Sequence, residues 1–270
     1  MREIEDLAAM IEAGSVLAVT GAGISTDSGL PDYRGSGGSE EPSVDYDMFC
    51  GDERWRRWVW QRNHETWRTL DNLEPTAGHR ILASWEREGL LLGIATQNID
   101  GLHAKAGSEA VEMHGSFRSV VCIDCDASFP RGDLDPLFTK LNPGYEWDPD
   151  PAHAAILATA NREKAEASTF VVPPCPTCGG ILKPDIVFFG QAVQGIPEAF
   201  DLARKASSVL VLGSSLLVLT GMWVVTEAYT HGADLAIINR GPTQADRLVH
   251  LRFDTGISET LTKVDALLRG

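Results

Sequence analysis

A short apolar run, Val16 to Val19, leads directly into the glycine-rich segment TGAGISTDSGLPDYR at residues 20–34. A β-branched run that stops at such a turn predicts the first strand of a nucleotide-binding α/β unit. Gly21 and Gly23 would let the backbone turn tightly and approach a phosphate group. The segment therefore predicts a site for nucleotide phosphates just beyond the first strand.

Ser25 and Thr26 follow the glycines and are predicted to cap the next helix. Free N–H groups at that helix start, together with the helix dipole, favour a bound pyrophosphate. The spacing differs from the dehydrogenase fingerprint because Thr26 stands where a third glycine belongs. Asp45 and Asp47, the acidic candidates about twenty positions further on, lie in a Gly/Ser/Pro-rich loop rather than at the end of a second strand. The chain is expected to bind a dinucleotide in a pose unlike that of a hydride-transfer enzyme.

Apolar runs and helical patterns alternate along the chain, which predicts a parallel sheet covered by helices on both faces. Residues 35–75 differ, because a Gly/Ser-rich loop is followed there by a tryptophan-dense stretch. Its helical spacing predicts that the tryptophans form the core of a small helical lobe, an aromatic wall beside a ligand being the alternative. The predicted strands are Ser15–Thr20, Leu90–Thr96, Val209–Gly213 and Leu235–Asn239, the predicted helices lie near residues 1–13, 52–72, 76–88, 197–206 and 221–231, and the tryptophans are Trp55, Trp58, Trp60 and Trp67.

The formal net charge of −15 over 270 residues argues against non-specific nucleic-acid binding, which needs clustered lysine and arginine. The acidic balance fits basic protein or peptide substrates, or a solvated acidic surface. The N-terminal segment MREIEDLAAMIEAG lacks the features of a signal or transit peptide, so a cytoplasmic location is expected. The uncharged run from Ser207 to Thr226 approaches the length of a membrane span, but Gly213 to Ser215 interrupt it, which predicts a strand, a turn and a buried helix instead.

Four of the five cysteines form two C-x2-C pairs, Cys122 with Cys125 and Cys175 with Cys178, while Cys50 stands alone. In a chain without a secretory signal, such pairs are typical of a tetrahedral zinc site, a redox dithiol pair being the alternative. Four thiolates fill the coordination sphere, so the zinc would be structural. The 49 residues between the pairs are expected to carry structure of their own, and residues 152–167 look helical.

Polar segments also follow the later predicted strands, where α/β folds bind ligands. In TQNIDGLH at residues 96–103, Gln97, Asn98 and Asp100 offer amide and carboxylate groups suited to ribose hydroxyls and a carboxamide. His114 lies in EMHGS; a lone histidine is usually a satisfied structural residue, although its pKa also suits a base. The remaining segments are GSSLLV at residues 213–218 and NRG at residues 239–241.

Taken in order, these segments resemble the sirtuin family, the NAD-dependent protein deacylases. The matching motifs run from residue 20 to about residue 260: GAGIS (21–25), GLPDYR (29–34), TQNIDGLH (96–103), MHGS (113–116), the two C-x2-C pairs, KPDIVFFG (183–190), GSS (213–215) and NRG (239–241).

The resemblance implies an α/β fold in which a Rossmann-type parallel sheet forms the large domain and a smaller subdomain is zinc-binding and helical. NAD and acyl-lysine would enter the cleft between them. Within one catalytic domain at 1–270, residues 1–34, 76–118 and 183–270 would form the Rossmann-type NAD-binding part, residues 35–75 the cofactor loop and helical lobe, and residues 119–182 the zinc-binding module.

The resemblance further implies the reaction. The acyl-lysine carbonyl oxygen would attack C1′ of the NAD ribose as nicotinamide leaves a pocket built by Asn98, Ile99 and Asp100. His114 would act as the general base, activating a ribose hydroxyl that adds to the resulting alkylimidate. A histidine suits this role because its unperturbed pKa lies near the operating pH. The products would be nicotinamide, free lysine and O-acyl-ADP-ribose.

Binding residues are carried over by position in the same way. The substrate backbone would be added as a strand between Phe189–Gly190 and Leu216–Val218, a mode that tolerates varied sequences. Acyl-lysine proteins or peptides would be the partners, with neither nucleic acid nor a membrane involved. The implied residues are His114, Asn98 and Asp100 for catalysis; Gly21, Ala22, Gly23, Ser25, Asp32, Tyr33, Arg34, Gln97, Asn98, Ile99, Asp100, Gly213, Ser214, Ser215, Asn239, Arg240, Gly241 and Ile257 for NAD; Phe189, Gly190, Leu216 and Val218 for substrate; and Cys122, Cys125, Cys175 and Cys178 for structural Zn²⁺.

The chain departs from the commonest sirtuin pattern at two places. It reads GSSLLVLTG from residue 213, where many sirtuins carry threonine after the first glycine and proline near residue 220. Gln191 stands where an acidic residue usually follows FG. With the long insert between the cysteine pairs, these features are similar to the class II branch, which includes a mitochondrial sirtuin with lipoamidase and ADP-ribosyl transfer activity. The resemblance to that branch points away from simple deacetylation as the main activity.

Two alternative functions remain open from the sequence. A protein mono-ADP-ribosyltransferase would use the same C1′ electrophile with a protein side chain as the acceptor. A non-catalytic module would bind NAD or ADP-ribose without reaction, but it would have no need of a base such as His114 beside the ribose.

Overall fold

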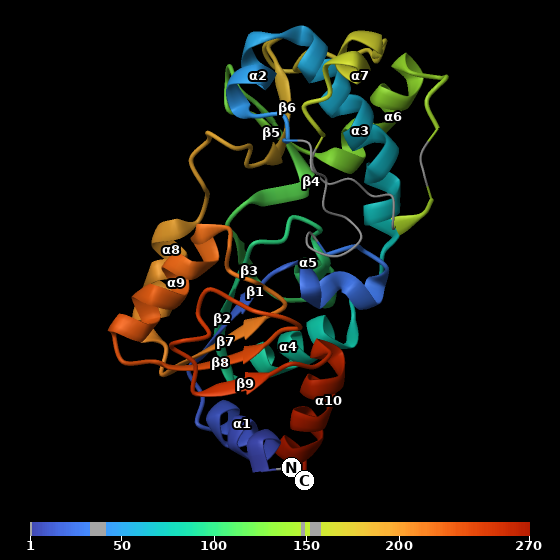
Figure 1. The fold of residues 1–270 in the computed structure, drawn as a ribbon. Helices are drawn as coiled ribbons and strands as arrows, with labels where there is room; N and C mark the ends of the chain where they lie inside the picture. The colour runs from blue at the N-terminus through green and yellow to red at the C-terminus, as the bar shows by residue number, and fades with distance from the viewer. Residues whose placement is uncertain (1, 33–41, 147–148, 152–157) are drawn as a thin grey trace. The chain divides into compact units, whose positions relative to one another are not determined.

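The computed structural model describes residues 2–32, 42–146, 149–151 and 158–270 (Figure 1). The chain divides into two compact units: unit 1 comprises Met1–Leu30, Glu74–His114 and Val193–Gly270, and unit 2 comprises Pro31–Leu73 and Gly115–Ala192. Residues 115–118 and 183–192 thus belong to unit 2, whereas the sequence-based division placed them in the Rossmann-type part. That division stays a prediction of domain organisation.

Unit 1 contains a six-stranded sheet whose neighbouring strands all pair in parallel. Its order, β3-β2-β1-β7-β8-β9, becomes 3-2-1-4-5-6 when the strands of unit 1 are counted along the chain, which is the Rossmann order. The order reverses between β1 and β7, and open α/β sheets bind ligands at the carboxyl ends of the strands beside such a switch point. The strands are β1 (Val16–Thr20), β2 (Leu91–Thr96), β3 (Ala110–Glu112), β7 (Ser208–Leu212), β8 (Asp234–Ile238) and β9 (Leu251–Phe253).

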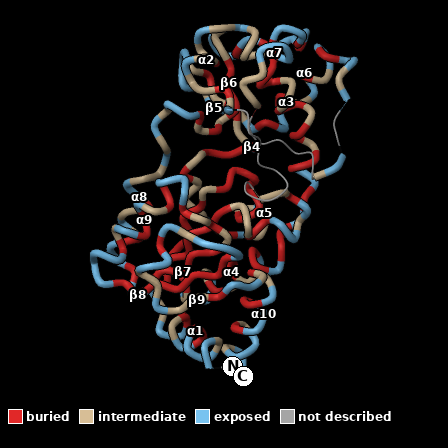
Figure 2. Tube along the Cα trace, viewed as in Figure 1, coloured by how far each residue is buried: buried red, intermediate tan, exposed pale blue. Residues whose placement is uncertain are grey.

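Helices bury both faces of this sheet (Figures 1 and 2). Along β1, Val16 and Ala18 belong to one hydrophobic core, while Leu17 and Val19 belong to the other. Strands covered on both sides are apolar at successive positions, and each fully buried valine or leucine contributes about 1.5–3 kcal/mol. The first core is covered by α1 (Arg2–Glu12), α4 (Ala77–Arg87) and α10 (Ile257–Leu268), and the second by α8 (Ile196–Lys205) and α9 (Leu219–Thr230).

The four predicted strands and five predicted helices are confirmed, with ends that differ by at most two residues. Two strands of unit 1 were missed, since β3 and β9 have only three residues each and show no clear alternation. Helix α10 was also missed, although Ile257, Leu261 and Val264 recur at helical spacing. In the described part of the chain, no helix is long and apolar enough to cross a membrane. Within the long uncharged run, residues 208–212 form β7 and residues 219–226 belong to α9.

Unit 2 combines a three-stranded antiparallel sheet, ordered β5-β4-β6, with helices. Its long helix α3 carries the tryptophans, and Trp58, Trp60 and Trp67 are buried, as predicted for a helical core. Trp60 stacks on Phe138 with ring centroids 4.6 Å apart, and its Nε1 donates to Leu182 O at 2.9 Å. The elements are α2 (Tyr46–Gly51), α3 (Glu53–Asn72), β4 (Gly115–Cys122), β5 (Ser128–Pro130), α6 (Arg131–Leu141), α7 (Arg162–Ala167) and β6 (Leu182–Ile186).

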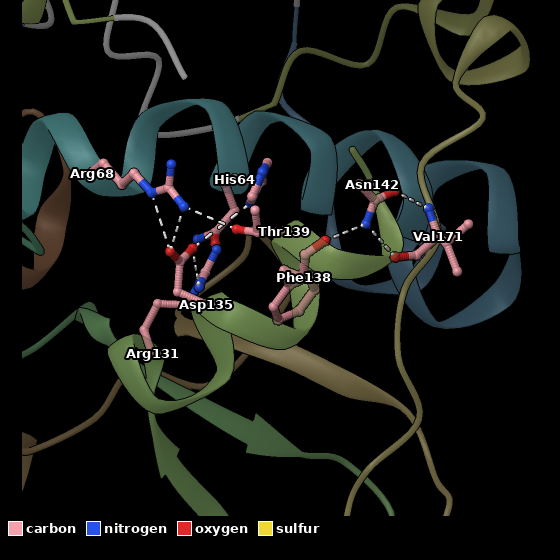
Figure 3. Close-up of polar contacts among 9 residues, drawn as sticks. His64, Arg68, Arg131, Asp135, Phe138, Thr139, Asn142 and Val171 are labelled. Atoms are coloured by element: carbon pink, nitrogen blue, oxygen red, sulfur yellow. Dashed lines mark hydrogen bonds and ion pairs between the residues drawn. The ribbon is translucent and has the colours of Figure 1, made fainter. Parts of the chain in front are cut away.

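A polar network joins α3 to α6 inside unit 2 (Figure 3). Arg131 is fully buried at the start of α6, where it binds Asp135 Oδ1 at 3.1 Å and donates through Nε to Asn63 Oδ1 at 2.8 Å. Arg68 binds the other oxygen of Asp135 at 2.9 Å. Burial lowers the pKa of Arg131 to about 10, which still leaves the guanidinium charged near neutral pH. The network is therefore a structural anchor between the two helices.

The insert between the cysteine pairs contains β5, α6 and α7, which confirms the prediction that it carries secondary structure of its own. The helix predicted at residues 152–167 is only partly right, because α7 begins at Arg162 and residues 158–161 are not helical. Asn161 stops the helix from extending backward, since its side chain caps α7 by accepting Lys164 N–H at 3.0 Å. Residues 152–157 lie outside the described part.

Candidate active site

The turn after β1 packs tightly against the turn after β7. Gly21 N–H donates to Leu212 O at 3.0 Å, and Gly23 N–H donates to Gly213 O at 2.9 Å. A Cβ at Gly23 would lie 2.6 Å from Gly213 Cα, and Gly213 itself has a φ of +62°. The glycines are therefore required by the contact between these two turns at the switch point of the sheet.

The helix that follows is the short 3₁₀ helix η1 (Ala22–Ser28), and the predicted capping by Ser25 and Thr26 is wrong. Ser25 lies inside η1, and its hydroxyl donates to Asp100 Oδ2 at 2.7 Å. Thr26 Oγ1 donates to Gly23 O at 3.0 Å, within its own turn. The Ser25 hydroxyl is therefore used in a tertiary hydrogen bond and the Thr26 hydroxyl in a local one, so neither caps the start of the helix.

The other residues predicted for the cofactor loop are only partly described. Ala22 is half-buried at the start of η1, and Asp32 is half-buried in unit 2. Tyr33 and Arg34, predicted to face the reacting ribose, lie outside the described residues.

The segment after β2 is hydrogen-bonded to the turn after β1. Asn98 Nδ2 donates to Gly21 O and to Ser25 Oγ, both at 3.2 Å. Asp100 accepts the Ser25 hydroxyl through one oxygen and Leu102 N–H, at 2.9 Å, through the other. Burial raises the pKa of the Asp100 carboxyl, although these hydrogen bonds favour its charged form. Asn98 and Asp100 are therefore held in fixed positions beside the glycine turn.

The His114 imidazole follows β3 and is held at both nitrogens. Its Nδ1 lies 2.9 Å from Gln97 O, and its Nε2 lies 2.8 Å from Thr220 Oγ1. Because a carbonyl oxygen can only accept, Nδ1 must carry the hydrogen, which leaves Nε2 of the neutral ring as an acceptor. Burial lowers the pKa of His114, while the Gln97 carbonyl raises it by a smaller amount. The ring is therefore a neutral base with its lone pair on a defined nitrogen.

Most of the other predicted NAD residues follow the carboxyl ends of the parallel strands, which lie along one edge of the sheet of unit 1. Ser214 donates to Gln97 Oε1 at 2.8 Å, which joins the turn after β7 to the segment after β2. Asn239 is buried after β8 and donates to the carbonyls of Arg240 and Gly241. The structure places Gly213, Ser214 and Ser215 after β7, Asn239, Arg240 and Gly241 after β8, Ile99 buried after β2, and Ile257 at the start of α10.

The predicted substrate residues belong to different units. In unit 1, Leu216 is buried with a φ of +59°, and Val218 is exposed just before α9. In unit 2, Phe189 is exposed, and its carbonyl accepts Tyr46 N–H at 3.0 Å. The strand-like pairing of a peptide with Phe189–Gly190 and Leu216–Val218 stays a prediction.

The cysteine pairs meet in unit 2, and the Sγ atoms of Cys122, Cys125, Cys175 and Cys178 all lie within 4.8 Å of one another. Cys122 Sγ lies 3.5 Å from Cys178 Sγ, and Cys125 Sγ lies 3.9 Å from Cys175 Sγ. Both distances are close to the spacing of about 3.8 Å that tetrahedral Zn–S bonds of about 2.3 Å require. All four are free cysteines rather than disulfides. Two N–H groups, from Thr177 and Gly180, point at the sulfurs of the second pair. The donor set and its spacing fit a structural zinc ion with no open coordination position.

Sequence reasoning missed three side chains that shape this site. Thr220 contacts His114, and the only signal for it was a hydroxyl residue in an apolar stretch next to a glycine. His79 and His103 are buried with their ring centroids 4.7 Å apart, and His103 Nε2 lies 2.9 Å from Thr20 Oγ1 at the end of β1. Nothing in the pattern around either histidine predicts this contact.

Comparisons with known proteins agree with this geometry. The Sir2 family profile matches residues 21–220. NAD-dependent protein deacetylase 1 of Streptomyces coelicolor is 43% identical over 97% of this chain and 89% of that protein. The mitochondrial NAD-dependent protein lipoamidase sirtuin-4 of Bos taurus is 38% identical over 93% of this chain and 81% of that protein. A solved structure of Sir2 with a p53 peptide and NAD⁺ superimposes with a TM-score of 0.75 at 28% identity, covering 98% of each chain. The chain belongs to the Sir2 family.

Proposed function

We propose that this chain is an NAD-dependent protein-lysine deacylase whose products are nicotinamide, free lysine and O-acyl-ADP-ribose. The observation that carries the proposal is the His114 ring, which is neutral, held at both nitrogens and joined through Gln97 to the turn after β7. A base of this kind is needed to activate a hydroxyl and is not needed merely to bind a nucleotide. The deacetylase and lipoamidase activities named for the relatives support the same reaction class.

NAD fits the residues at the edge of the sheet. The glycine turn and the residues after β7 and β8 occupy the positions where Rossmann folds hold a dinucleotide. When bound, NAD supplies a ribose C1′ that becomes electrophilic as nicotinamide leaves. Asn98 and Asp100 would hold the carboxamide of nicotinamide with amide and carboxyl groups, and their mutual hydrogen bonds through Ser25 keep them in place. His114 would remove the proton of the ribose hydroxyl through Nε2.

Within this proposal, the acyl group that the enzyme removes from lysine is still to be identified. The likeness to the class II branch at Ser214 and Gln191 favours an acyl chain longer than acetyl, and the lipoamidase relative supports it. The partners are acyl-lysine proteins or peptides, as the peptide in the Sir2 structure suggests for that protein. The cytoplasmic location stays a prediction that cell fractionation would test.

The deciding experiment measures nicotinamide release from NAD with acetyl-, long-chain acyl-, succinyl- and lipoyl-lysine peptides. It compares the wild type with His114→Ala and with His231→Ala, which makes the same change at an exposed residue beyond α9. We expect acyl-dependent release with O-acyl-ADP-ribose as the product, lost in His114→Ala and kept in His231→Ala. The peptide that reacts fastest identifies the acyl preference.

Two results would replace the proposal with the alternatives. Release that does not depend on the acyl group, with ADP-ribose found on protein by mass spectrometry, would indicate a mono-ADP-ribosyltransferase. Tight NAD binding without release, for every peptide tested, would indicate a non-catalytic NAD-binding module.

A further inference from the structure

Thr220 is the second residue of α9 and is 5% exposed, with its hydroxyl directed at the proposed base. Its Oγ1 lies 2.8 Å from His114 Nε2 and accepts Gln97 Nε2–H at 3.1 Å. The three side chains come from the segments after β2 and β3 and from the first turn of α9, all within unit 1. Many sirtuins carry proline near this position, and proline has no hydroxyl. The contact between Thr220 and His114 is therefore not a feature of the commonest sirtuin pattern.

The direction of each hydrogen bond follows from the chemistry of the partners. The Gln97 amide orientation is fixed at both ends, because Nε2 donates to Val218 O at 3.0 Å and Oε1 accepts the Ser214 hydroxyl at 2.8 Å. Gln97 therefore presents N–H to Thr220 Oγ1. Since His114 Nδ1–H donates to Gln97 O, His114 Nε2 must accept, and Thr220 must donate its hydroxyl hydrogen to it.

This assignment leaves one position on Thr220. A hydroxyl has one hydrogen and two acceptor lone pairs. Thr220 gives its hydrogen to His114 and accepts from Gln97, so, among the contacts of the described residues, one lone pair of Oγ1 remains. The single lone pair of His114 Nε2 is already used. In the absence of substrate these hydrogen bonds are all made. A hydroxyl of the substrate can therefore donate a further hydrogen bond to Thr220 Oγ1 without breaking any of them.

Gly221 keeps the arrangement compact. A Cβ at this position would lie 2.7 Å from Gln97 Oε1 and 3.0 Å from Leu216 Cδ2. Thr220 thus provides the hydroxyl that contacts His114. Gly221 leaves the space for the Gln97 side chain, which orients that hydroxyl.

We propose that Thr220 relays the proton from the ribose hydroxyl of NAD to His114. As the ribose O–H bond breaks, its proton forms a new bond to Thr220 Oγ1, and the original Thr220 hydrogen passes to His114 Nε2. The ribose oxygen adds to the acyl-derived carbon, and the charge that results on the imidazolium is stabilised by the Gln97 carbonyl at Nδ1. This inference rests on the proposed deacylase function and assigns Thr220 a catalytic role within it.

The test compares Thr220→Val, which keeps the shape but removes the hydroxyl, with Thr220→Ser, which keeps the hydroxyl. Thr226→Val serves as the matched control, because it makes the same change at an exposed position of the same helix. Two reactions are followed with the preferred acyl peptide: exchange of labelled nicotinamide into NAD, which precedes the base-dependent step, and formation of deacylated peptide. We expect Thr220→Val to keep exchange and to lose deacylation by about 100-fold or more, the usual contribution of acid–base catalysis. Thr220→Ser should recover most of the rate, and Thr226→Val should match the wild type.

A measurement without NAD provides an independent readout. In ¹⁵N spectra of the histidine-labelled protein, His114 should show a protonated Nδ1 and a hydrogen-bonded, unprotonated Nε2. In Thr220→Val the Nε2 resonance should move toward the value of an acceptor without a donor, and Thr220→Ser should restore it.

Several outcomes would overturn the relay. Unchanged deacylation in Thr220→Val would show that the ribose hydroxyl reaches His114 directly. Equal losses of exchange and deacylation in both Thr220 variants would place the defect in NAD binding or folding. A wild type that exchanges nicotinamide but forms no deacylated peptide would instead contradict the proposed function, which keeps the two failures distinct.

Discussion

At the residue scale, burial determines the charge state of His114. The base must be neutral to accept a proton, and burial lowers its pKa below the ordinary histidine value of about 6.5. The rate should therefore stay high as the pH falls through that value and decline only at lower pH. A profile of kcat/KM for the free enzyme against pH measures this limb directly. An acidic limb centred above the ordinary histidine value would contradict the argument.

The buried pair His79 and His103 makes a second prediction at this scale. Burial lowers the pKa of His79 to about 2 and that of His103 to about 4, so both are neutral in the folded protein and become protonated more readily on unfolding. Their contribution to stability is complete above pH about 6.5 and is lost as the pH falls toward the folded values. The free energy of unfolding should fall by up to about 1.4 kcal/mol per pH unit for each histidine.

Urea unfolding between pH 8 and pH 5 measures this slope. His103→Gln should be less stable than the wild type at pH 8, because its contact with Thr20 is altered, but its stability should fall less steeply with pH. Equal slopes in the two proteins would mean that His103 does not carry the pH dependence.

At the element scale, the contact between the turns after β1 and β7 is predicted to tolerate no side chain. In Gly23→Ala the new Cβ would lie 2.6 Å from Gly213 Cα, which is backbone and cannot move aside cheaply. We expect a loss of about 1–3 kcal/mol of stability, typical of overpacking, and weaker NAD binding because the turn must shift. Thermal unfolding and calorimetry with NAD measure the two effects. Gly51→Ala, at a glycine with open space around its Cβ position, is the control and should change neither.

The helices, strands and turns also show which features could be predicted from the sequence and which could not. The strands beside the switch point were predictable because burial on both faces makes them continuous apolar runs, as in residues 16–20 and 208–212. The polar segment after β2 was predictable because ligand-binding residues follow such strands. The role of Ser25 was not, since its bond to Asp100 joins residues 75 positions apart and replaced the local capping rule. Thr220 was missed for the same reason, because its partner lies 106 positions away.

At the scale of the whole molecule, the four cysteines bring together the two ends of a long insert. Each C-x2-C pair is local, but 49 residues lie between the two pairs, and this segment carries β5, α6 and α7 of unit 2. The ends of β4 and β6 pair beside the cluster, with Cys122 opposite Leu182. A zinc ion here would fix the two ends of the insert and the sheet of unit 2 at once.

Removal of zinc is therefore predicted to unfold unit 2, because structural zinc contributes about 10–16 kcal/mol to the folding of such modules. Hydrogen exchange during chelation should show protection lost first in β4, β5 and β6, and deacylation should be lost with it. Cys178→Ser should bind less zinc and behave like the chelated protein, while Cys50→Ser, a cysteine outside the cluster, should keep both zinc and protection. Full deacylation after complete zinc depletion would show that the insert is held by its own packing, such as the Arg68 and Asp135 contact between α3 and α6, rather than by the metal.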